Sequence, residues 1–185
     1  MSAIEKTKQF APAGTWSADP VHSNVAFEVI HAGVNTFRGS FTDFSATLAG
    51  GEEPTLDGSA TIASVDVKDE NLNAHLQTPD FFDAQRFPEI AFRATKLRRL
   101  DDNRVEGSGE LTMKGATQPI ELTGAIAAAP VTDPMGREWL SLHLETTIDR
   151  TAFGVSWNAP NQTGGDYVAN DVKLLVDLAL IRQAG

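Results

Sequence analysis

Apolar and polar residues alternate along most of the chain, with the period of a β-strand that buries one face. In the run 25–31, Val25, Phe27 and Val29 share one face while Glu28 takes the other. The same alternation recurs at 42–48, 56–67, 90–96, 104–111, 120–126, 139–148 and 172–181. These runs predict about eight strands joined by short turns, that is, an antiparallel all-β fold.

Two segments depart from this rhythm. The parity of the apolar residues changes near Ser64, which predicts a β-bulge inside the run 56–67. Residues 68–76 do not alternate, and Leu72 and Leu76 have the spacing of one helix face, so we expect one short helical insertion near residues 68–83. The last run is partly apolar on both faces, and we expect this helix to cover its outer face.

Small residues on the inward parity bear on how the strands close. Eight antiparallel strands form either a barrel or a sandwich, and Gly58, Gly107, Gly109 and Gly124 leave little volume on the inward face. Either the sheet bends sharply at these glycines or the interior is incompletely filled. No change in composition marks a linker, so we expect one domain over 14–185, preceded by an N-terminal extension over 1–13.

Composition and charge narrow the classes of function. Hydrophobic residues make up 41% of the chain and the formal net charge is −10, which fits a packed protein and disfavours nucleic acid as a partner. There is no cysteine, so disulfides and thiol chemistry are excluded. The first ten residues contain no apolar run of the kind a signal peptide needs, and no later run is long enough to span a membrane. We therefore expect a cytoplasmic protein without an integral membrane segment.

Candidate catalytic groups are few. His22 and His31 are nine residues apart and fall on opposite faces of a regular strand, and His75 and His143 offer no ligand spacing, so we expect no metal site. No nucleophile motif is present, and we predict no catalytic residue and no cofactor. The alternative function is an enzyme that acts on an apolar substrate, with His22, His31 or Arg150 as acid, base or anion clamp. If Arg150 has no such role, we expect it to be buried against Asp149 or Asp171.

Six runs in the chain together resemble one known family. They are DPVHSNVAFEVIHAGV (19–34), FRGSF (37–41), HLQTPDFFD (75–83), FPEIAF (87–92), GELTMKGATQP (109–119) and RTAFG (150–154). Their order and spacing resemble the YceI-like proteins, which are also called polyisoprenoid-binding or bacterial lipocalin-like proteins. The resemblance implies an elongated, eight-stranded, lipocalin-like β-barrel that holds a long apolar chain, and it also implies a homodimer. Many relatives carry an export signal and work in the periplasm, and this chain begins without such a signal.

The resulting prediction is binding, storage or transport of a long-chain amphiphilic lipid, such as an isoprenoid quinone or polyprenyl compound, bound as a ligand in the barrel. From strand parity, the predicted lining consists of Val25, Phe27, Val29, Phe44, Ala46, Ile62, Phe92, Ala94, Val105, Ile120, Leu122, Leu140, Leu142, Leu144, Leu174 and Val176. The predicted entrance consists of Phe81, Phe82, Phe153 and Trp157. A third interpretation is a filled barrel that acts as a stress-related structural protein.

Overall fold

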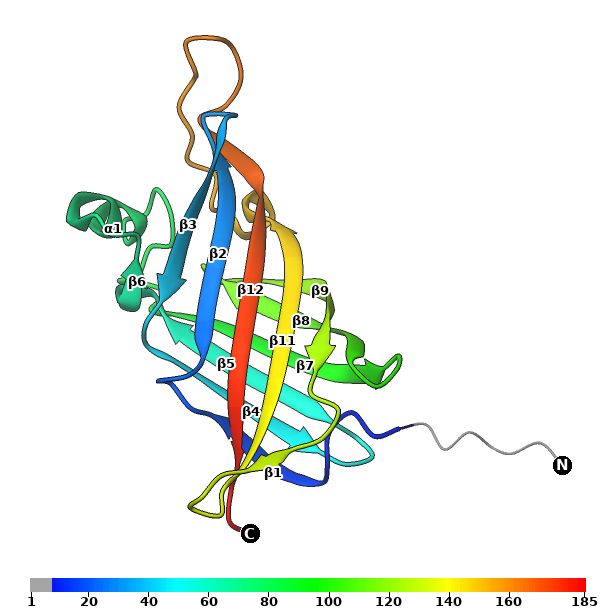
Figure 1. Cartoon of the computed structure of the whole chain (residues 1–185). Helices are drawn as coiled ribbons and strands as arrows, with labels where there is room; N and C mark the ends of the chain where they lie inside the picture. The colour runs from blue at the N-terminus through cyan, green and yellow to red at the C-terminus, as the bar shows by residue number, and fades with distance from the viewer. Residues whose placement is uncertain (1–7) are drawn as a thin grey trace, which may run out of the picture.

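The computed structural model describes residues 8–185, whose twelve strands form one antiparallel sheet that closes on itself (Figure 1). Residues 1–7, which carry part of the predicted extension and part of the stretch behind the export prediction, lie outside the described residues. The strands are β1 (Gly14–Ala18), β2 (Asn24–His31), β3 (Asn35–Phe41), β4 (Phe44–Gly50), β5 (Thr55–Thr61), β6 (Val65–Asp66), β7 (Glu89–Arg99), β8 (Arg104–Met113), β9 (Ala116–Ile126), β10 (Val131–Thr132), β11 (Glu138–Asp149) and β12 (Val168–Arg182). The helix α1 (Glu70–Leu76) and the 3₁₀ turns η1 (Ile62–Ser64) and η2 (Arg150–Phe153) interrupt them.

Closure depends on β12, which pairs with β11 along one edge and with β2 and then β1 along the other. Several short strands lie end to end and so share one position around the barrel. β2 and β1 share the position next to β12, β3 and β4 share the next position, and β6 and β5 share the one after that. The twelve segments therefore occupy eight positions around an elongated barrel. This confirms the predicted eight-stranded antiparallel barrel.

The departures from alternation have local causes. The parity change near Ser64 comes from the turn η1 rather than from a β-bulge. The helical insertion is confirmed, and α1 is capped by Asp69, whose side chain accepts a hydrogen bond from the Leu72 amide at 2.8 Å. The predicted cover over the outer face of β12 is wrong, because Leu72 and Leu76 line the barrel interior together with Val172 and Leu174.

The inward glycines have two different surroundings. A Cβ on Gly109 would lie 2.2 Å from the Arg93 carbonyl oxygen, and a Cβ on Gly124 would lie 1.8 Å from that of His143. At these two positions the absence of a side chain lets neighbouring strands come close together. A Cβ on Gly58 would meet nothing closer than 3.4 Å, and this glycine borders a cavity.

One end of the barrel is packed solid. Trp16, Leu48, Leu140 and Leu180 are at most 1% exposed, and Phe10 from the predicted N-terminal extension is buried with them. The Trp16 indole donates a hydrogen bond to the Pro12 carbonyl at 3.0 Å. These side chains close the end of the barrel near the C-terminus.

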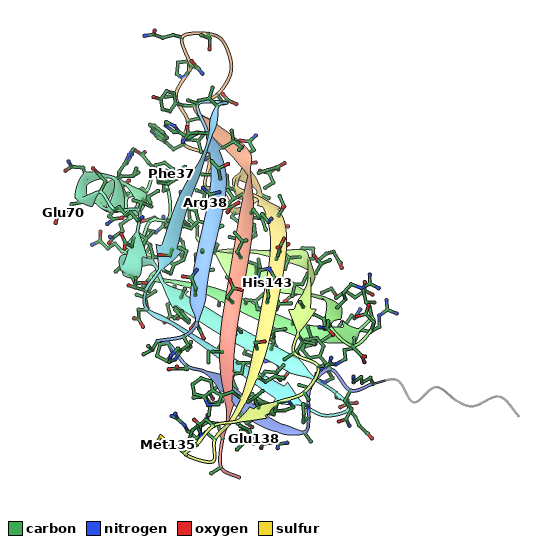
Figure 2. The ribbon with its side chains drawn as sticks, viewed as in Figure 1. Phe37, Arg38, Glu70, Met135, Glu138 and His143 are labelled. Atoms are coloured by element: carbon green, nitrogen blue, oxygen red, sulfur yellow. The ribbon has the colours of Figure 1, made fainter. Side chains whose placement is uncertain are left out.

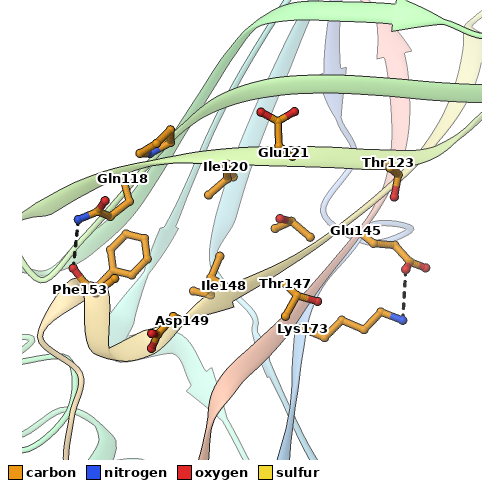
Figure 3. A pocket seen from close by; sticks show the side chains of 13 residues that line it. Gln118, Ile120, Glu121, Thr123, Glu145, Thr147, Ile148, Asp149, Phe153 and Lys173 are labelled. Atoms are coloured by element: carbon orange, nitrogen blue, oxygen red, sulfur yellow. Dashed lines mark hydrogen bonds and ion pairs between the residues drawn. The ribbon is translucent and has the colours of Figure 1, made fainter.

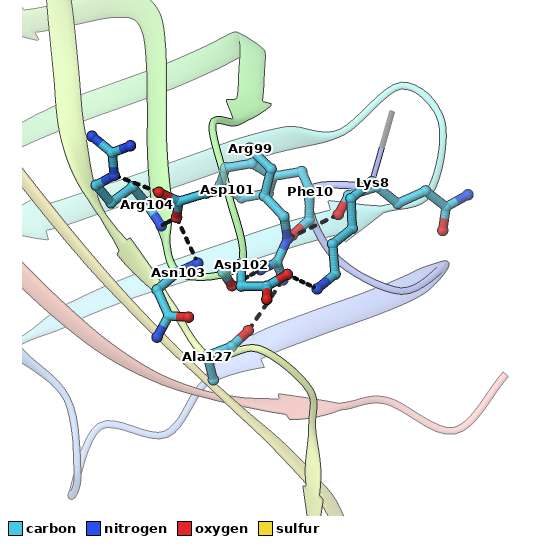
Figure 4. Close-up of polar contacts among 9 residues, drawn as sticks. Lys8, Phe10, Arg99, Asp101, Asp102, Asn103, Arg104 and Ala127 are labelled. Carbon is cyan, nitrogen blue, oxygen red and sulfur yellow. Dashed lines mark hydrogen bonds and ion pairs between the residues drawn. The ribbon is translucent and has the colours of Figure 1, made fainter. Parts of the chain in front are cut away.

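Arg99 holds the N-terminal segment against this closed end (Figure 4). Its guanidinium donates to the carbonyl of Gln9 at 3.0 Å, to that of Phe10 at 3.2 Å and to that of Ala127 at 3.1 Å, and also to the Asp102 carbonyl. Burial lowers the pKa of Arg99 below its ordinary value. One side chain thus joins three separate chain segments.

Candidate functional site

Two apolar cavities lie end to end inside the barrel. The wide cavity has a volume of about 510 Å³ and the narrow cavity about 120 Å³. Phe41, Ile90 and Leu174 border both of them, so the two cavities adjoin at these side chains. The interior is therefore only partly filled.

The narrow cavity is lined mainly by aliphatic side chains and backbone. Ala46 and Gly58 border it from β4 and β5, and Val25, Leu144 and Val176 border it from the facing strands. These strands turn their inward residues toward the same space, as the alternation predicts. A narrow apolar slot of this kind suits a thin hydrocarbon chain.

The end of the wide cavity away from the narrow cavity is bordered by side chains with polar groups. We call this end the mouth, and its residues are His31, Asn35, His75, Trp157 and Tyr167. The His31 and Tyr167 rings meet edge to face at 4.7 Å, and the His75 ring meets Trp157 edge to face at 5.1 Å. Tyr167 is 40% exposed, so the mouth reaches solvent. The site thus has an apolar body and a partly polar rim.

Arg150 borders the wide cavity but is occupied by the backbone. Its guanidinium donates to the carbonyls of Ala169 at 2.9 Å, Val155 at 2.7 Å, Trp157 at 3.0 Å and Val168 at 3.2 Å. Burial lowers the pKa of Arg150 below its ordinary value. The expected burial is confirmed, but the partners are carbonyl oxygens instead of the carboxylates of Asp149 or Asp171. Arg150 fixes the loop that forms the mouth.

Of the residues predicted to line the site, thirteen border one of the two cavities. They are Val25, Phe27, Val29, Ala46, Phe81, Phe82, Phe92, Ile120, Leu122, Leu144, Trp157, Leu174 and Val176. Strand parity had placed ten of them on the inward face, and Phe81, Phe82 and Trp157 had been predicted at the entrance. Whether they bind a ligand stays a prediction.

The other seven lie in the packed part of the barrel, and their assignment to the cavity wall is corrected here. They are Phe44, Ile62, Ala94, Val105, Leu140, Leu142 and Phe153. Phe44, Ile62, Ala94, Val105, Leu140 and Leu142 belong to the hydrophobic core or pack against it. Phe153, predicted at the entrance, is 2% exposed and packs between η2 and β9 instead.

Sequence reasoning missed several residues of the wide cavity, including Phe37, Phe41, Leu72 and Tyr167. Phe37 and Phe41 have the same parity and belong to the FRGSF run, so this signal was available. Tyr167 comes next to the loop that Arg150 holds, and no periodicity marks it.

Of the three residues of the enzyme alternative, His31 and Arg150 border the wide cavity, but His22 does not. His22 lies at the closed end, where it contacts Asp19 and meets the Trp139 ring edge to face at 5.7 Å, whereas His31 lies at the mouth. Within residues 8–185, no three His, Asp or Glu side chains form a group that could hold a metal ion. None of the helices in this part of the chain is long and apolar enough to cross a bilayer.

Comparison with known proteins places this barrel in a family, because the model of the YceI-like domain matches residues 16–180. The chain belongs to the YceI-like family. This YceI-like protein is 31% identical over 164 residues to the UPF0312 protein SA2479 of Staphylococcus aureus strain N315, covering 84% of this chain and 90% of the relative.

Solved structures support the fold. The crystal structure of Burkholderia cenocepacia BcnA matches with a TM-score of 0.73 and 20% identity over 90% of this chain and 99% of that one. A polyisoprenoid binding domain from Saccharophagus degradans, implicated in plant cell wall breakdown, matches with a TM-score of 0.68 and 11% identity over 91% of this chain and 98% of that one. At these identities the likeness concerns the fold of the YceI-like barrel.

Proposed function

We propose that this protein binds one amphiphilic lipid, with its apolar chain along the two cavities and its polar end at the mouth. The observation that carries this proposal is that the wide and narrow cavities adjoin, with Phe41, Ile90 and Leu174 bordering both. A compact ligand would need only the wide cavity. A long chain uses both.

The chemistry of the wall supports a hydrocarbon chain. A chain that extends inward from the mouth lies along aromatic side chains such as Phe81 and Trp157, and then along the aliphatic wall of the narrow cavity. Each buried CH₂ contributes about 0.8 kcal/mol. An isoprenoid quinone or polyprenyl compound is the class we favour, and the name of the Saccharophagus degradans structure supports it. Storage or transport of that lipid is the corresponding role.

The mouth sets the environment of the polar end. His31, Asn35 and Tyr167 present ring nitrogens, an amide and a hydroxyl, and nearby Arg150 is already bonded to carbonyls. These groups offer hydrogen bonds without a free fixed charge, which suits a neutral head such as a quinone or an alcohol.

The test is displacement of a fluorescent lipid by prenols that differ only in the number of isoprene units. Affinity is expected to rise with chain length and then level off, when the chain reaches the packed layer at Trp16 and Leu140. Equal affinity for the shortest and longest prenols would contradict a chain-binding tunnel. Native mass spectrometry of the purified protein would show any lipid retained from the cell.

A further inference from the structure

The barrel wall contains a gap between β9 and β11. These strands pair only from Leu142 with Ile126 to Glu145 with Thr123, yet β9 begins at Ala116 and β11 continues to Asp149. If the pairing continued in register, Thr147 would face Glu121. Instead the two edges diverge, and Pro119, which has no amide hydrogen to donate, lies on the diverging part of β9.

A groove of about 570 Å³ lies in this gap (Figure 3). We call it the side gap and define it by residues 118–121 and 146–149. Figure 3 shows Ile120 and Ile148 extending from the two strands toward each other, with Phe153 beyond them. The Gln118 side-chain amide donates to the Ala152 carbonyl at 3.2 Å and holds η2 against β9.

The side gap shares its floor with both interior cavities. Ile120, Glu145 and Thr146 border the groove and also the narrow cavity, and Ile148 borders the groove and the wide cavity. Only one layer of side chains therefore separates the outside of the barrel from the interior path at this point. No strand has to unpair for that layer to open, because no register pair joins β9 to β11 there.

The rim of the side gap carries more negative than positive charge. Glu121, Glu145 and Asp149 border it together with one cation, Lys173, which lies 3.2 Å from Glu145. Hydrogen bonds from His143 and Lys173 lower the pKa of Glu145, and those from Thr151 lower the pKa of Asp149. Glu145 and Asp149 therefore stay ionised near neutral pH, and their negative charges repel phosphate.

We propose that the side gap is a lateral portal through which the apolar chain of an uncharged lipid enters and leaves the barrel, and whose acidic rim slows the entry of prenyl phosphates. This inference rests on the proposed lipid binding. The portal adds two points to that proposal: the route by which the lipid enters, and the charge of the lipid that uses this route.

A covalent bridge across the side gap tests the route. Because the natural chain has no cysteine, the exposed pair Glu121→Cys and Thr147→Cys is the only target for a bifunctional maleimide. The matched control is Ser108→Cys with Glu121→Cys, which bridges the register partners of β8 and β9. The probe is a prenol carrying a small uncharged fluorophore. The bridge across the gap is expected to slow uptake and release at least about tenfold, and the control bridge by less than about twofold.

The outcomes separate the two proposals. Unchanged rates across the bridged gap, with normal binding by the unbridged protein, would overturn the portal and leave the mouth as the route. Failure of the unbridged protein to bind the prenol would overturn lipid binding, and the portal with it.

A charge reversal tests the selectivity. With Glu121→Lys, uptake of a fluorescent prenyl phosphate is expected to rise several-fold at low salt, while uptake of the uncharged prenol stays unchanged. The matched control is Glu53→Lys, an equal change at an exposed position in the turn between β4 and β5, away from the side gap. An equal gain with both variants would attribute the effect to net charge and overturn selection at the gap.

Discussion

Ala46 on β4 and Gly58 on β5 are register partners, and both border the narrow cavity. A Cβ on Gly58 would lie 3.8 Å from the Ala46 Cβ, at ordinary van der Waals contact. Two of the smallest residues therefore keep this part of the interior open. The width of the path depends on them directly.

Enlarging Ala46 is expected to shorten the chain that the barrel accepts. In Ala46→Leu the new side chain occupies the narrow cavity, so the affinity for the longest prenols falls about tenfold or more through the loss of buried CH₂ groups. Short prenols keep their affinity. The free energy of unfolding changes by less than about 1 kcal/mol, because the space already exists. The measurements are displacement titrations and urea denaturation.

Ala94→Leu is the matched control. Ala94 is fully buried and borders neither the narrow nor the wide cavity, so a larger side chain would have to displace packed neighbours. We expect a loss of about 1 to 3 kcal/mol in the free energy of unfolding. Equal destabilisation by both variants would show that the narrow cavity is filled.

Replacing Arg150 is expected to loosen the mouth. Arg150→Lys retains the charge, but its compact ammonium cannot reach all four carbonyls that the guanidinium nitrogens bond. Arg150→Met has no donor for any of them. Both variants are expected to lose about 2 to 4 kcal/mol of stability. Limited proteolysis is expected to cut faster within residues 155–168.

The control for Arg150 is Arg38→Met on the outer surface. The Arg38 side chain is 67% exposed and pairs with Glu28 at 3.0 Å, so its loss is expected to cost less than about 0.5 kcal/mol. Wild-type stability of Arg150→Met combined with lost lipid affinity would instead place Arg150 in contact with the lipid.

His143 predicts a pH dependence of stability. It lies on the outer face of the barrel between β11 and β12 (Figure 2), with Nε2 at 3.0 Å from Glu145 and Nδ1 at 2.6 Å from Asp177. Neutral imidazole has one N–H, so only the protonated ring donates to both carboxylates. The bond to Glu145, followed by that to Asp177, raises the pKa of His143 above its ordinary value of 6.5.

Because the folded pKa is raised, the stabilisation by His143 is complete below about pH 6.5 and is lost as pH rises through the folded value. His143→Gln is therefore expected to lower stability by a few tenths to about 1 kcal/mol at pH 6 and by less at pH 9. Thermal unfolding at both pH values measures this. The difference should shrink in 1 M salt, and a larger deficit at pH 9 would contradict the assignment.

Alternation located most strands because one-sided burial demands it, but it did not find every strand. In β3 the inward positions are Phe37, Gly39 and Phe41, and a Cβ on Gly39 would come within 2.3 Å of the Phe27 ring. From sequence alone, a glycine inside a run indicates a turn, because the sequence does not show that a distant side chain fills the space its own side chain lacks. The turn η1 was similarly mistaken for a bulge, since both devices shift parity.

The candidate site could be predicted only in part, for a related reason. Ala46 and Ala94 are the same residue on the same inward parity, yet one borders a cavity and the other is fully packed. Parity determines the face of the sheet. The size and distance of the opposing side chains, which come from strands far away in sequence, determine whether space remains.

The long pairing of β11 with β12 sets the length of the barrel wall. Trp139 to Asp149 pair with Ile181 to Asp171 without a break, over a distance of roughly 34 Å at about 3.4 Å per residue. Inserting two residues into each strand would lengthen the strands by about 7 Å and keep every inward residue inward, whereas inserting one residue would move the inward residues beyond it to the outer face. Relatives that hold longer chains are thus expected to differ from this protein by even-numbered insertions in these two strands.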